Sequence, residues 1–233
     1  MFHKKITRIM ISSEQQRTIG WFRDRLGIIT GSKIGSLMKA GKGEPFSATA
    51  KGYLYQLAGE RALSKDIVND DEMFQFYLDQ TSVTSKAMRF GTEQEANARV
   101  CYSDVTGNEV IEVGLCKHPT IPYIASSPDG IVRTPSGEIG CLEIKCPTLQ
   151  TYAQYCAEIN DADGLLKVNP DYYYQCQSHI ACTGAAWCDF AVYCPFTNNP
   201  IHIVRIERND EAIARLIDRS TLAEQFIENL KLN

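Results

Sequence analysis

The sequence has no run of about 18 consecutive apolar residues, the length that a helix needs to cross a bilayer. Its first ten residues, MFHKKITRIM, are too polar for the central stretch of a secretory signal peptide. The sequence thus argues against both membrane insertion and secretion. We expect a cytoplasmic protein with no membrane partner.

The nine cysteines lack the spacing of a metal site or a redox motif. No CxxC pair occurs, and no histidine pair lies near the cysteines in the sequence. We therefore do not expect structural zinc. Buried free thiols in a reducing compartment fit these cysteines better than disulfides do.

Internal repeats, low-complexity segments and long Pro/Gly/Ser-rich linkers are also absent. The 233 residues, 44% of them hydrophobic, are therefore expected to form a single domain over 1–233. The net charge of −4 is unevenly spread, because residues 1–60 hold ten Lys or Arg against four Asp or Glu, which gives +6 and leaves −10 for the rest. A basic face on an acidic protein permits a nucleic acid partner without requiring one.

The first part of the chain, over 1–63, is expected to be helical and basic. Ser13 and Gln16 have the spacing of a capping box, and Gly27 is typical of a helix end, so a helix is expected over 13–26. Two further helices are expected to begin after Thr30 and Ser47 and to end near residues 38 and 63.

Residues 64–84 are polar and acidic, and we interpret them as a connection. Ser85 is expected to begin a long helix that runs to Thr106 and that Gly107 ends. Glu95 lies on the small-residue face of this helix, where a carboxylate is costly to bury without a cation, a metal or hydrogen-bond donors. The alternative is that this face is simply solvated.

From residue 109 onward the apolar pattern changes to the alternation that is typical of strands. Antiparallel strands are expected at 109–116, 122–127, 129–133 and 139–147. They are followed by a helix from about 148, a loop, a helix over 170–183, strands at 187–194 and 201–208, and a closing helix over 210–231. This order predicts an α/β fold with a mixed central β-sheet flanked by helices.

The residues that carry chemistry lie in two of these strands. Side chains alternate along a strand, so Glu143 and Lys145 share one face, while Leu142 and Ile144 enter the other. Asp129 precedes Glu143 by one tight turn, which can bring the two carboxylates side by side. Two such carboxylates repel each other unless a cation lies between them, and oxygen ligands suit Mg²⁺. Lys145 could then position or deprotonate the water that attacks a phosphodiester.

The same residues allow a plainer interpretation. A D…ExK pattern also occurs by chance, where it is the solvated face of an amphipathic strand. Its context in this chain favours chemistry, because Pro128-Asp129 and Glu143-Ile144-Lys145 have the order and the strand setting of the PD-(D/E)xK nuclease superfamily, which the chain resembles. The segment 85–208 would then be the catalytic part.

The resemblance extends over most of the chain. It is to the phage lambda-type alkaline exonucleases, a viral recombinase family within that superfamily that serves recombination by single-strand annealing. The segments that carry it occur in the expected order: LGIITGSKIGSLM (26–38), FGTEQEANAR (90–99), SSPDG (126–130), CLEIKCP (141–147), YYQCQ (173–177) and VRIER (204–208). The loop 39–46 and the stretch 64–84 do not match closely.

The resemblance implies a set of metal ligands. Asp129 and Glu143 would bind Mg²⁺, for which Mn²⁺ could substitute, and the carbonyl of Ile144 would be a further ligand. Glu95 would match an additional acidic residue near a second metal. The cofactor implied is therefore Mg²⁺.

It also implies roles for polar residues around the metal. Lys145 would activate the attacking water and Gln175 would lie near that water, although a glutamine on a helix is more often a plain surface residue. Arg25, Ser32 and Ser127 would grip a 5′-terminal phosphate. Arginine suits this task because its planar fork binds phosphate oxygens bidentately.

The function implied is a 5′→3′ exonuclease that degrades one strand of double-stranded DNA from its end to mononucleotides. The 3′ single-stranded tail would serve a single-strand annealing protein. The family further implies a processive homotrimeric ring around DNA, and a bacterial host cytoplasm if a phage encodes the protein.

Two other functions remain open. An endonuclease of the same superfamily would share Asp129, Glu143 and Lys145 without needing the phosphate pocket. A catalytically silent DNA-binding or assembly module could keep the fold alone. His118 and His179 lack the spacing of metal ligands, and neither is assigned a role.

Overall fold

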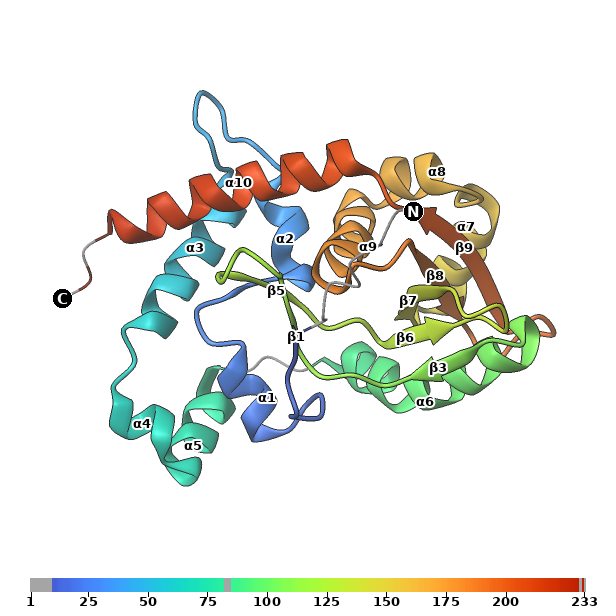
Figure 1. Ribbon diagram of the computed structural model, residues 1–233, viewed down its shortest axis with the longest axis horizontal. Coiled ribbons are helices and arrows are strands. Elements are labelled where there is room, and N and C mark those ends of the chain that lie inside the picture. The colour runs from blue at the N-terminus through green and yellow to red at the C-terminus, as the bar shows by residue number, and fades with distance from the viewer. Residues whose placement is uncertain (1–9, 82–84, 231, 233) are drawn as a thin grey trace, which may run out of the picture.

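The computed structural model describes residues 10–81, 85–230 and 232, and its strands form two sheets (Figure 1). The larger sheet has the order β3-β6-β7-β8-β9. Its strands are β3 (Glu109–Ile111), β6 (Gly130–Arg133), β7 (Ile139–Lys145), β8 (Trp187–Tyr193) and β9 (Ile201–Glu207). The β7–β8 pair is parallel and the other neighbouring pairs are antiparallel, so the mixed sheet predicted from the sequence is confirmed.

The smaller sheet joins the front of the chain to the segment before Asp129. Its order is β1-β4-β5-β2, with the strands β1 (Met10–Ile11), β4 (Cys116–Lys117), β5 (Ile124–Ser126) and β2 (Ile29–Thr30). The β2–β5 pair is parallel, with Ile29 opposite Ile124 and Thr30 opposite Ala125. This pairing places two segments about 95 residues apart in the sequence side by side.

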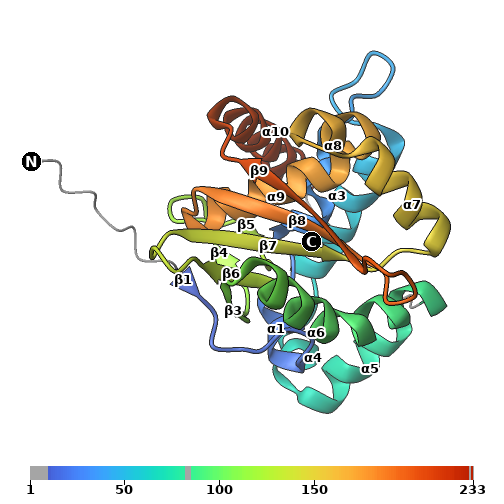
Figure 2. The same cartoon turned by 90° about the vertical axis from the view of Figure 1, so that its right-hand side faces the viewer.

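The larger sheet has a helix on each face. Helix α6 (Lys86–Thr106) lies on one side and α9 (Pro170–Thr183) on the other (Figure 2). Tyr102 of α6 packs in one apolar cluster with Leu142, while Cys141, its neighbour on β7, packs in the cluster that contains α9. The alternating faces of β7 therefore each have a covering helix, as the alternation of its sequence requires.

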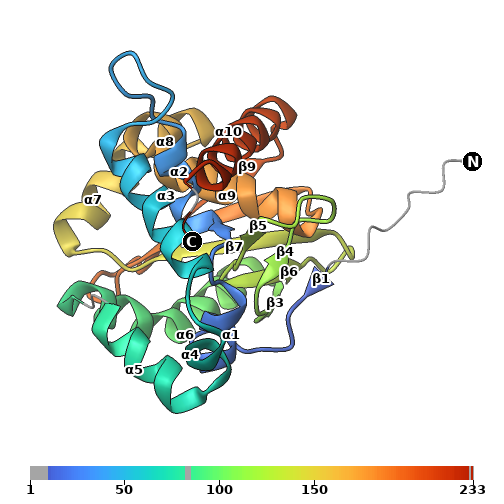
Figure 3. The ribbon, with the colours of Figure 1, turned by 90° about the vertical axis from the view of Figure 1, so that its left-hand side faces the viewer.

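The remaining helices surround this centre. They are α1 (Ile19–Asp24), α2 (Gly31–Leu37), α3 (Ala48–Arg61), α4 (Lys65–Asn69), α5 (Asp71–Thr81), α7 (Leu149–Glu158), α8 (Ala162–Val168) and α10 (Asp210–Glu228). Helix α10 packs against α2, α3 and α9. Helices α1, α4 and α5 gather at the opposite end of the molecule from α10 (Figure 3).

Two expectations for the front of the chain are wrong. The helix expected over 13–26 begins only at Ile19, with Thr18 as its N-cap. The predicted capping box does not form, because the Gln16 amide donates to the carbonyls of Val113 and Pro128 at 2.9 and 2.8 Å instead. Long-range hydrogen bonds thus prevail over a local capping pattern.

The connection expected over 64–84 is helical in its described part. Ser64 caps α4 by accepting from Ile67 N, and Asp70 accepts from Met73 N at the start of α5. Ser64 and Asp70 are residue types that favour helix N-caps, but the polar, acidic composition of 64–84 led us to interpret the segment as a connection. The loop expected before Pro170 likewise contains α8, which Asp161 caps.

The strand expected over 109–116 is divided between the two sheets. Residues 109–111 form β3, and the chain then crosses to β4, so a continuous strand does not form. Gly114 lies in the crossing, where a Cβ atom would stand 2.2 Å from the Glu14 carbonyl oxygen. The strand expected at 122–127 also joins the smaller sheet, as β5, rather than the larger one.

Other expectations are confirmed. Ser85 caps α6 and Gly107 ends it in the left-handed conformation, as predicted. Helix α9 has the predicted bounds, and α10 ends at Glu228 within the predicted 210–231. Residues 1–9 of the basic front part, 82–84 of the expected connection and residue 231 lie outside the described residues.

The nine cysteines are all free, six of them buried, as the sequence predicted. Burial raises the pKa of Cys116 to about 12, so this thiol stays protonated at neutral pH. In the described part of the chain, no helix is both long and apolar enough to cross a membrane.

Gly140 of β7 is needed because the Trp187 ring of β8 occupies the place of a Cβ atom there. A Cβ atom at this position would stand 2.3 Å from the ring of Trp187, and the guanidinium of Arg205 covers that ring at 3.8 Å. The Trp187 ring therefore has little room to move away.

We predict that Gly140→Ala lowers the free energy of unfolding by about 1–3 kcal/mol, because the methyl group overpacks the sheet. Urea unfolding followed by circular dichroism measures this change. Gly52→Ala is the matched control: it lies exposed in α3 with open space around it, and alanine there should stabilise the protein by up to about 1 kcal/mol. Equal effects of the two substitutions would contradict the close-approach argument.

Candidate active site

Strand β7 presents Glu143 and Lys145 on the face that α9 covers, as the alternation predicted. The Lys145 Nζ atom donates to Glu143 Oε1 at 2.5 Å. The Glu143 side chain is only 2% exposed, which makes it a buried carboxylate. A buried charge is costly unless it is paired and hydrogen-bonded, so the surroundings of Glu143 must supply donors.

The second Glu143 oxygen is bound by a histidine to which the sequence had assigned no role. His179 of α9 donates from Nε2 to Glu143 Oε2 at 2.6 Å, since a carboxylate can only accept. A ring with one hydrogen then accepts at Nδ1 from the Ser126 hydroxyl, which lies 2.6 Å away at the end of β5. Ser126, His179 and Glu143 thus form a buried hydrogen-bonded chain across β5, α9 and β7.

These partners decide the charge state of Glu143. Burial alone would raise the pKa of its carboxyl group, but Lys145 and the hydrogen bond from His179 outweigh burial and hold that pKa below its ordinary value. Burial would lower the pKa of Lys145, but the carboxylates of Glu143 and Asp129 outweigh it and keep that pKa above its ordinary value. The pair is therefore ionised at neutral pH.

Asp129 lies at the turn that enters β6. Its backbone N–H donates to the Leu142 carbonyl at 2.9 Å, and its Oδ2 atom accepts from the Ile144 N–H at 2.7 Å. These two bonds fix Asp129 beside β7. Burial, together with the negative charges of Glu143 and Glu95, raises the pKa of Asp129 well above its ordinary value.

Gln175 comes from α9, one turn before His179. Its Oε1 atom accepts from Lys145 Nζ at 3.5 Å, and its side chain is buried rather than on the helix surface. The ring of Tyr172 lies 4.5 Å from the same ammonium group. Lys145 therefore has neighbours from both β7 and α9.

Glu95 of α6 faces this group from the side of a cavity. Arg17 Nη2 donates to Glu95 Oε1 at 2.5 Å. A cavity of about 560 Å³ is lined by Glu95, Arg17, Arg99 and Asp129 among other residues. Glu95 is thus neither buried in the core nor on a freely solvated face, because it lines a polar cavity beside Asp129.

The donor set fits a hard divalent cation chemically. The carboxylates of Glu143 and Glu95 both lie near that of Asp129, and their repulsion contributes, after burial, to the raised pKa of Asp129. Oxygen ligands of this kind suit Mg²⁺ and Mn²⁺. Among the described residues, no three acidic, histidine or cysteine side chains converge as a ready-made metal cluster. Each of these three carboxylates accepts a hydrogen bond from another protein group.

The phosphate pocket expected from the sequence is partly assembled around Arg25. Arg25 Nη1 donates to Ser127 Oγ at 3.3 Å, and the guanidinium lies 4.1 Å from the Trp21 ring centre. Trp21 Nε1 also donates to Ser127 Oγ, at 3.2 Å. Burial lowers the pKa of Arg25 to about 10, so the group is still a cation at neutral pH.

Ser32 faces the same space without bonding to Arg25. A cavity of about 400 Å³ is lined by Arg25, Ser32, Lys33 and Tyr53, among residues of α1, α2, α3 and α5. In the described part of the chain, Arg25 forms no ion pair with a carboxylate. A partly buried cation beside hydroxyl groups in a cavity is suited to bind an anion.

Sequence reasoning missed two residues of this site. His179 and Arg17 each bind a proposed metal ligand, yet neither has the spacing of a ligand itself. One sequence signal existed for His179, since it lies one helical turn after Gln175 on the same helix. The sequence has no corresponding signal for Arg17, because its contact joins segments 78 residues apart.

Comparison with known proteins shows similarity over most of the chain. The profile of the YqaJ-like viral recombinase domain matches residues 20–186. An alkaline exonuclease from Laribacter hongkongensis, LHK-Exo, is 33% identical, with a TM-score of 0.69 over 92% of this chain and 96% of that chain. The structure of LHK-Exo in complex with dAMP matches with a TM-score of 0.70 over the same shares.

Two further proteins are similar to the chain, one in fold and one over part of the sequence. A phage related exonuclease from Haemophilus somnus 129PT is 15% identical, with a TM-score of 0.57 over 87% of this chain and 94% of that chain, which is a likeness of fold. Uncharacterized protein R354 of Acanthamoeba polyphaga mimivirus is 32% identical over 112 residues, or 46% of this chain. The match covers only 20% of R354, so this chain spans about a fifth of that relative's length.

We predict that His179→Phe lowers the free energy of unfolding by about 2–4 kcal/mol, because it leaves Glu143 Oε2 and the Ser126 hydroxyl buried without a partner. His179→Gln retains an amide donor and should lose less than half as much. Urea unfolding measures both changes. If the two substitutions destabilise the protein equally, the hydrogen bond to Glu143 has no specific part in stability.

Proposed function

The chain belongs to the YqaJ-like viral recombinase domain family, and we propose that it is a Mg²⁺-dependent nuclease that degrades one strand of double-stranded DNA from its 5′ end. One observation carries this proposal. The group around Glu143 and the pocket of Arg25 are both built on Ser126 at the end of β5 and on the residues that follow it, 127–129. A site for hydrolysis beside a site for a terminal phosphate is what an exonuclease requires.

We assign the metal ligands to Asp129, Glu143 and the carbonyl of Ile144, with Glu95 as an additional acidic residue near a second metal. Mg²⁺ is the proposed cofactor, and Mn²⁺ could substitute for it. When bound, such an ion would polarise the scissile phosphate and stabilise the developing negative charge. The raised pKa of Asp129 supports this assignment, since a cation would stabilise the ionised form that burial and the charges of Glu143 and Glu95 disfavour.

The remaining polar groups would orient water and substrate. Lys145 is an ammonium group in this setting, so it donates hydrogen bonds and stabilises negative charge next to the attacking water. Gln175 offers both a donor and an acceptor and would hold the same water. His179 would hold Glu143 in one orientation by binding its second oxygen.

The Arg25 pocket would decide the polarity of digestion. Arg25 would bind the 5′-terminal phosphate with Ser32 and Ser127 as hydroxyl donors, so that the chain end is held near the metal ligands. Hydrolysis at a fixed place from a 5′ end releases mononucleotides in the 5′→3′ direction. The complex of LHK-Exo with dAMP supports the release of mononucleotides, because dAMP is a deoxynucleoside monophosphate.

We further propose that the chain is a single nuclease domain over 1–233 that acts as a processive homotrimer. The 3′ tail that it leaves would serve a single-strand annealing protein during recombination. The proposed setting is the host cytoplasm, bacterial if a phage encodes the protein. The relation to viral recombinases supports this biological role.

An endonuclease of the same superfamily is the second candidate, because it would use the same metal ligands. A phosphate pocket would be of no use to an enzyme that cuts within a strand. Arg25 is a partly buried cation that lines a cavity and forms no ion pair among the described residues, and it therefore favours the exonuclease.

We predict that the purified protein with Mg²⁺ releases 5′-labelled mononucleotide from linear duplex DNA, while the 3′ label is retained and a covalently closed circle stays intact. EDTA should stop the reaction. Lys145→Ala should slow it at least about 100-fold with DNA binding largely kept. Lys167→Ala, which removes an exposed lysine of α8, is the control and should be fully active.

Two results would contradict this proposal. Cutting of the closed circle would favour the endonuclease, and the absence of any product with Mg²⁺ or Mn²⁺ would favour a silent binding module. Full activity of Lys145→Ala would remove Lys145 from the reaction.

We also predict that Arg25→Ala reduces the preference for 5′-phosphorylated over 5′-hydroxyl ends to about one, because the pocket loses its cation. Initial rates on the two substrates give this ratio. Arg23→Ala, two residues earlier in the last turn of α1, is the matched control: it removes an ion pair with Asp71 and should keep the preference. An unchanged ratio in Arg25→Ala would place the terminal phosphate elsewhere.

A further inference from the structure

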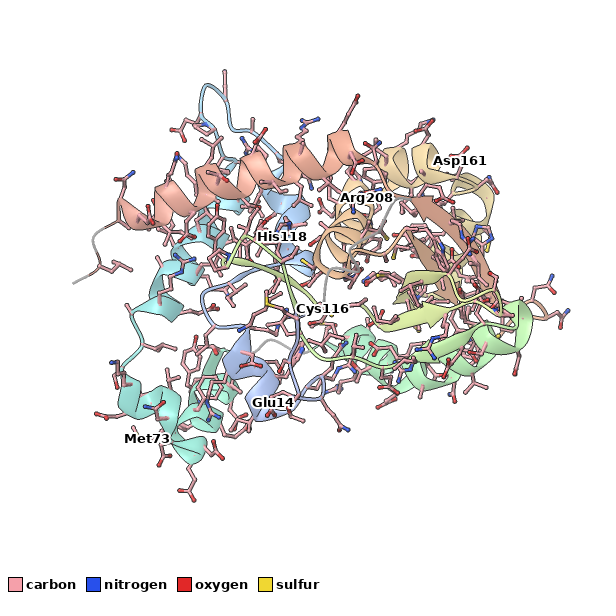
Figure 4. The ribbon with its side chains drawn as sticks, viewed as in Figure 1. Glu14, Met73, Cys116, His118, Asp161 and Arg208 are labelled. Carbon is pink, nitrogen blue, oxygen red and sulfur yellow. The ribbon has the colours of Figure 1, made fainter. Side chains whose placement is uncertain are left out.

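The loop before α1, residues 12–18, is fixed against the cavity that contains Glu95 and Asp129. Glu14, labelled in Figure 4, marks this loop. Ser12 N donates to the Leu115 carbonyl at 2.8 Å, and the Gln16 amide donates to two carbonyls that flank the site. Gly114 permits the close approach of the loop backbone. The loop is therefore held at both of its ends.

Arg17 has an unusual backbone conformation within this loop. Its φ of 69° makes it the one residue other than glycine with a positive φ in the described part of the chain. Such a conformation costs about 1–2 kcal/mol for a residue with a Cβ atom. Its neighbours in the loop are anchored by the hydrogen bonds above, and the Arg17 side chain lines the cavity.

The Arg17 guanidinium contacts Glu95 but stays open to solvent. The Arg17 side chain is 43% exposed, against 16% for Glu95. The other arginine that lines the cavity, Arg99, is 16% exposed and is engaged by Glu112 at 2.8 Å. Arg17 is thus the more accessible of the two arginines that line this cavity.

We infer that Arg17 binds a backbone phosphate of the DNA strand as that strand enters this cavity. This inference rests on the proposed function. A strand that reached Asp129 through this cavity would lie beside Glu95, Glu112 and Glu14, whose negative charges repel phosphate. A cation at this place offsets that repulsion. One edge of the planar guanidinium can remain on Glu95 while its other donors bind phosphate oxygens.

The contact would be independent of base sequence, because it reaches only the phosphate. It would therefore act on DNA affinity and on the salt dependence of binding. An ion pair with a purely structural role would instead act on stability alone. Measurements of DNA binding and of stability therefore distinguish a phosphate contact from a structural ion pair.

The test measures binding of a fluorescently labelled duplex with a 3′ tail by anisotropy, in EDTA, at several NaCl concentrations. Arg17→Ala should raise Kd roughly five- to tenfold and reduce the slope of log Kd against log salt by about 0.7–0.9, the value for one phosphate contact. Arg17→Lys should keep most of the slope. Arg215→Ala, an exposed arginine of α10, should change neither value.

Two further variants test the role of the Arg17 cation apart from its backbone strain and from its ion pair with Glu95. Arg17→Gly removes the cation but relieves the positive φ, so it should bind DNA as weakly as Arg17→Ala while melting at a higher temperature. Glu95→Gln removes the competing carboxylate and should tighten DNA binding. With a structural ion pair, Arg17→Ala and Glu95→Gln would instead lose similar stability and leave the salt slope unchanged.

Either an unchanged Kd and slope in Arg17→Ala, or weaker binding in Glu95→Gln with folding intact, would overturn the inference. Failure of the proposed function is recognised separately, as the absence of cleavage by the wild-type protein with Mg²⁺ or Mn²⁺. Cleavage in EDTA would contradict metal dependence, and binding would then be compared in a Lys145→Ala background.

Discussion

The buried carboxylate of Glu143 needs hydrogen-bond donors around it, and no single segment of the chain supplies them all. Desolvation of such a group costs several kcal/mol unless donors surround it. Lys145 supplies one donor from the same strand, but the other comes from His179 on α9, which is in turn held by Ser126 of β5. The packing of β7, α9 and β5 and the ionisation of Glu143 therefore depend on one another.

Strand β5 connects this buried chain to the rest of the site. The residues at the end of β5 and just after it form hydrogen bonds with different parts of the site. Ser126 bonds to His179, Ser127 to Arg25, and Asp129 to the backbone of β7. The parallel pairing of β5 with β2 brings the segment from Arg25 to Ser32 to the same region. A short strand of three residues thus fixes the position of the Arg25 pocket, the proposed phosphate site, relative to the carboxylates.

The site concentrates negative charge and then balances it with cations that differ in accessibility. Lys145 is held deep between β7 and α9, whereas Arg17 lies in the cavity on a strained but anchored loop. Arg25 lies apart, without a carboxylate partner among the described residues. This distribution suits a polyanion that must approach carboxylates closely, since each cation can meet a different phosphate.

The sequence by itself determined the features that depend on neighbours along the chain. Alternation placed Glu143 and Lys145 on one face, and capping residues such as Ser85 and Gly107 set helix ends, because a strand's period and a helix's unpaired groups are local properties. Only the tertiary structure decided the rest: the division of 109–116 between two sheets, the bond from His179 to Glu143 and that from Arg17 to Glu95. Those contacts join segments 36 to 78 residues apart, and their free energy arises only once the sheets and helices have packed.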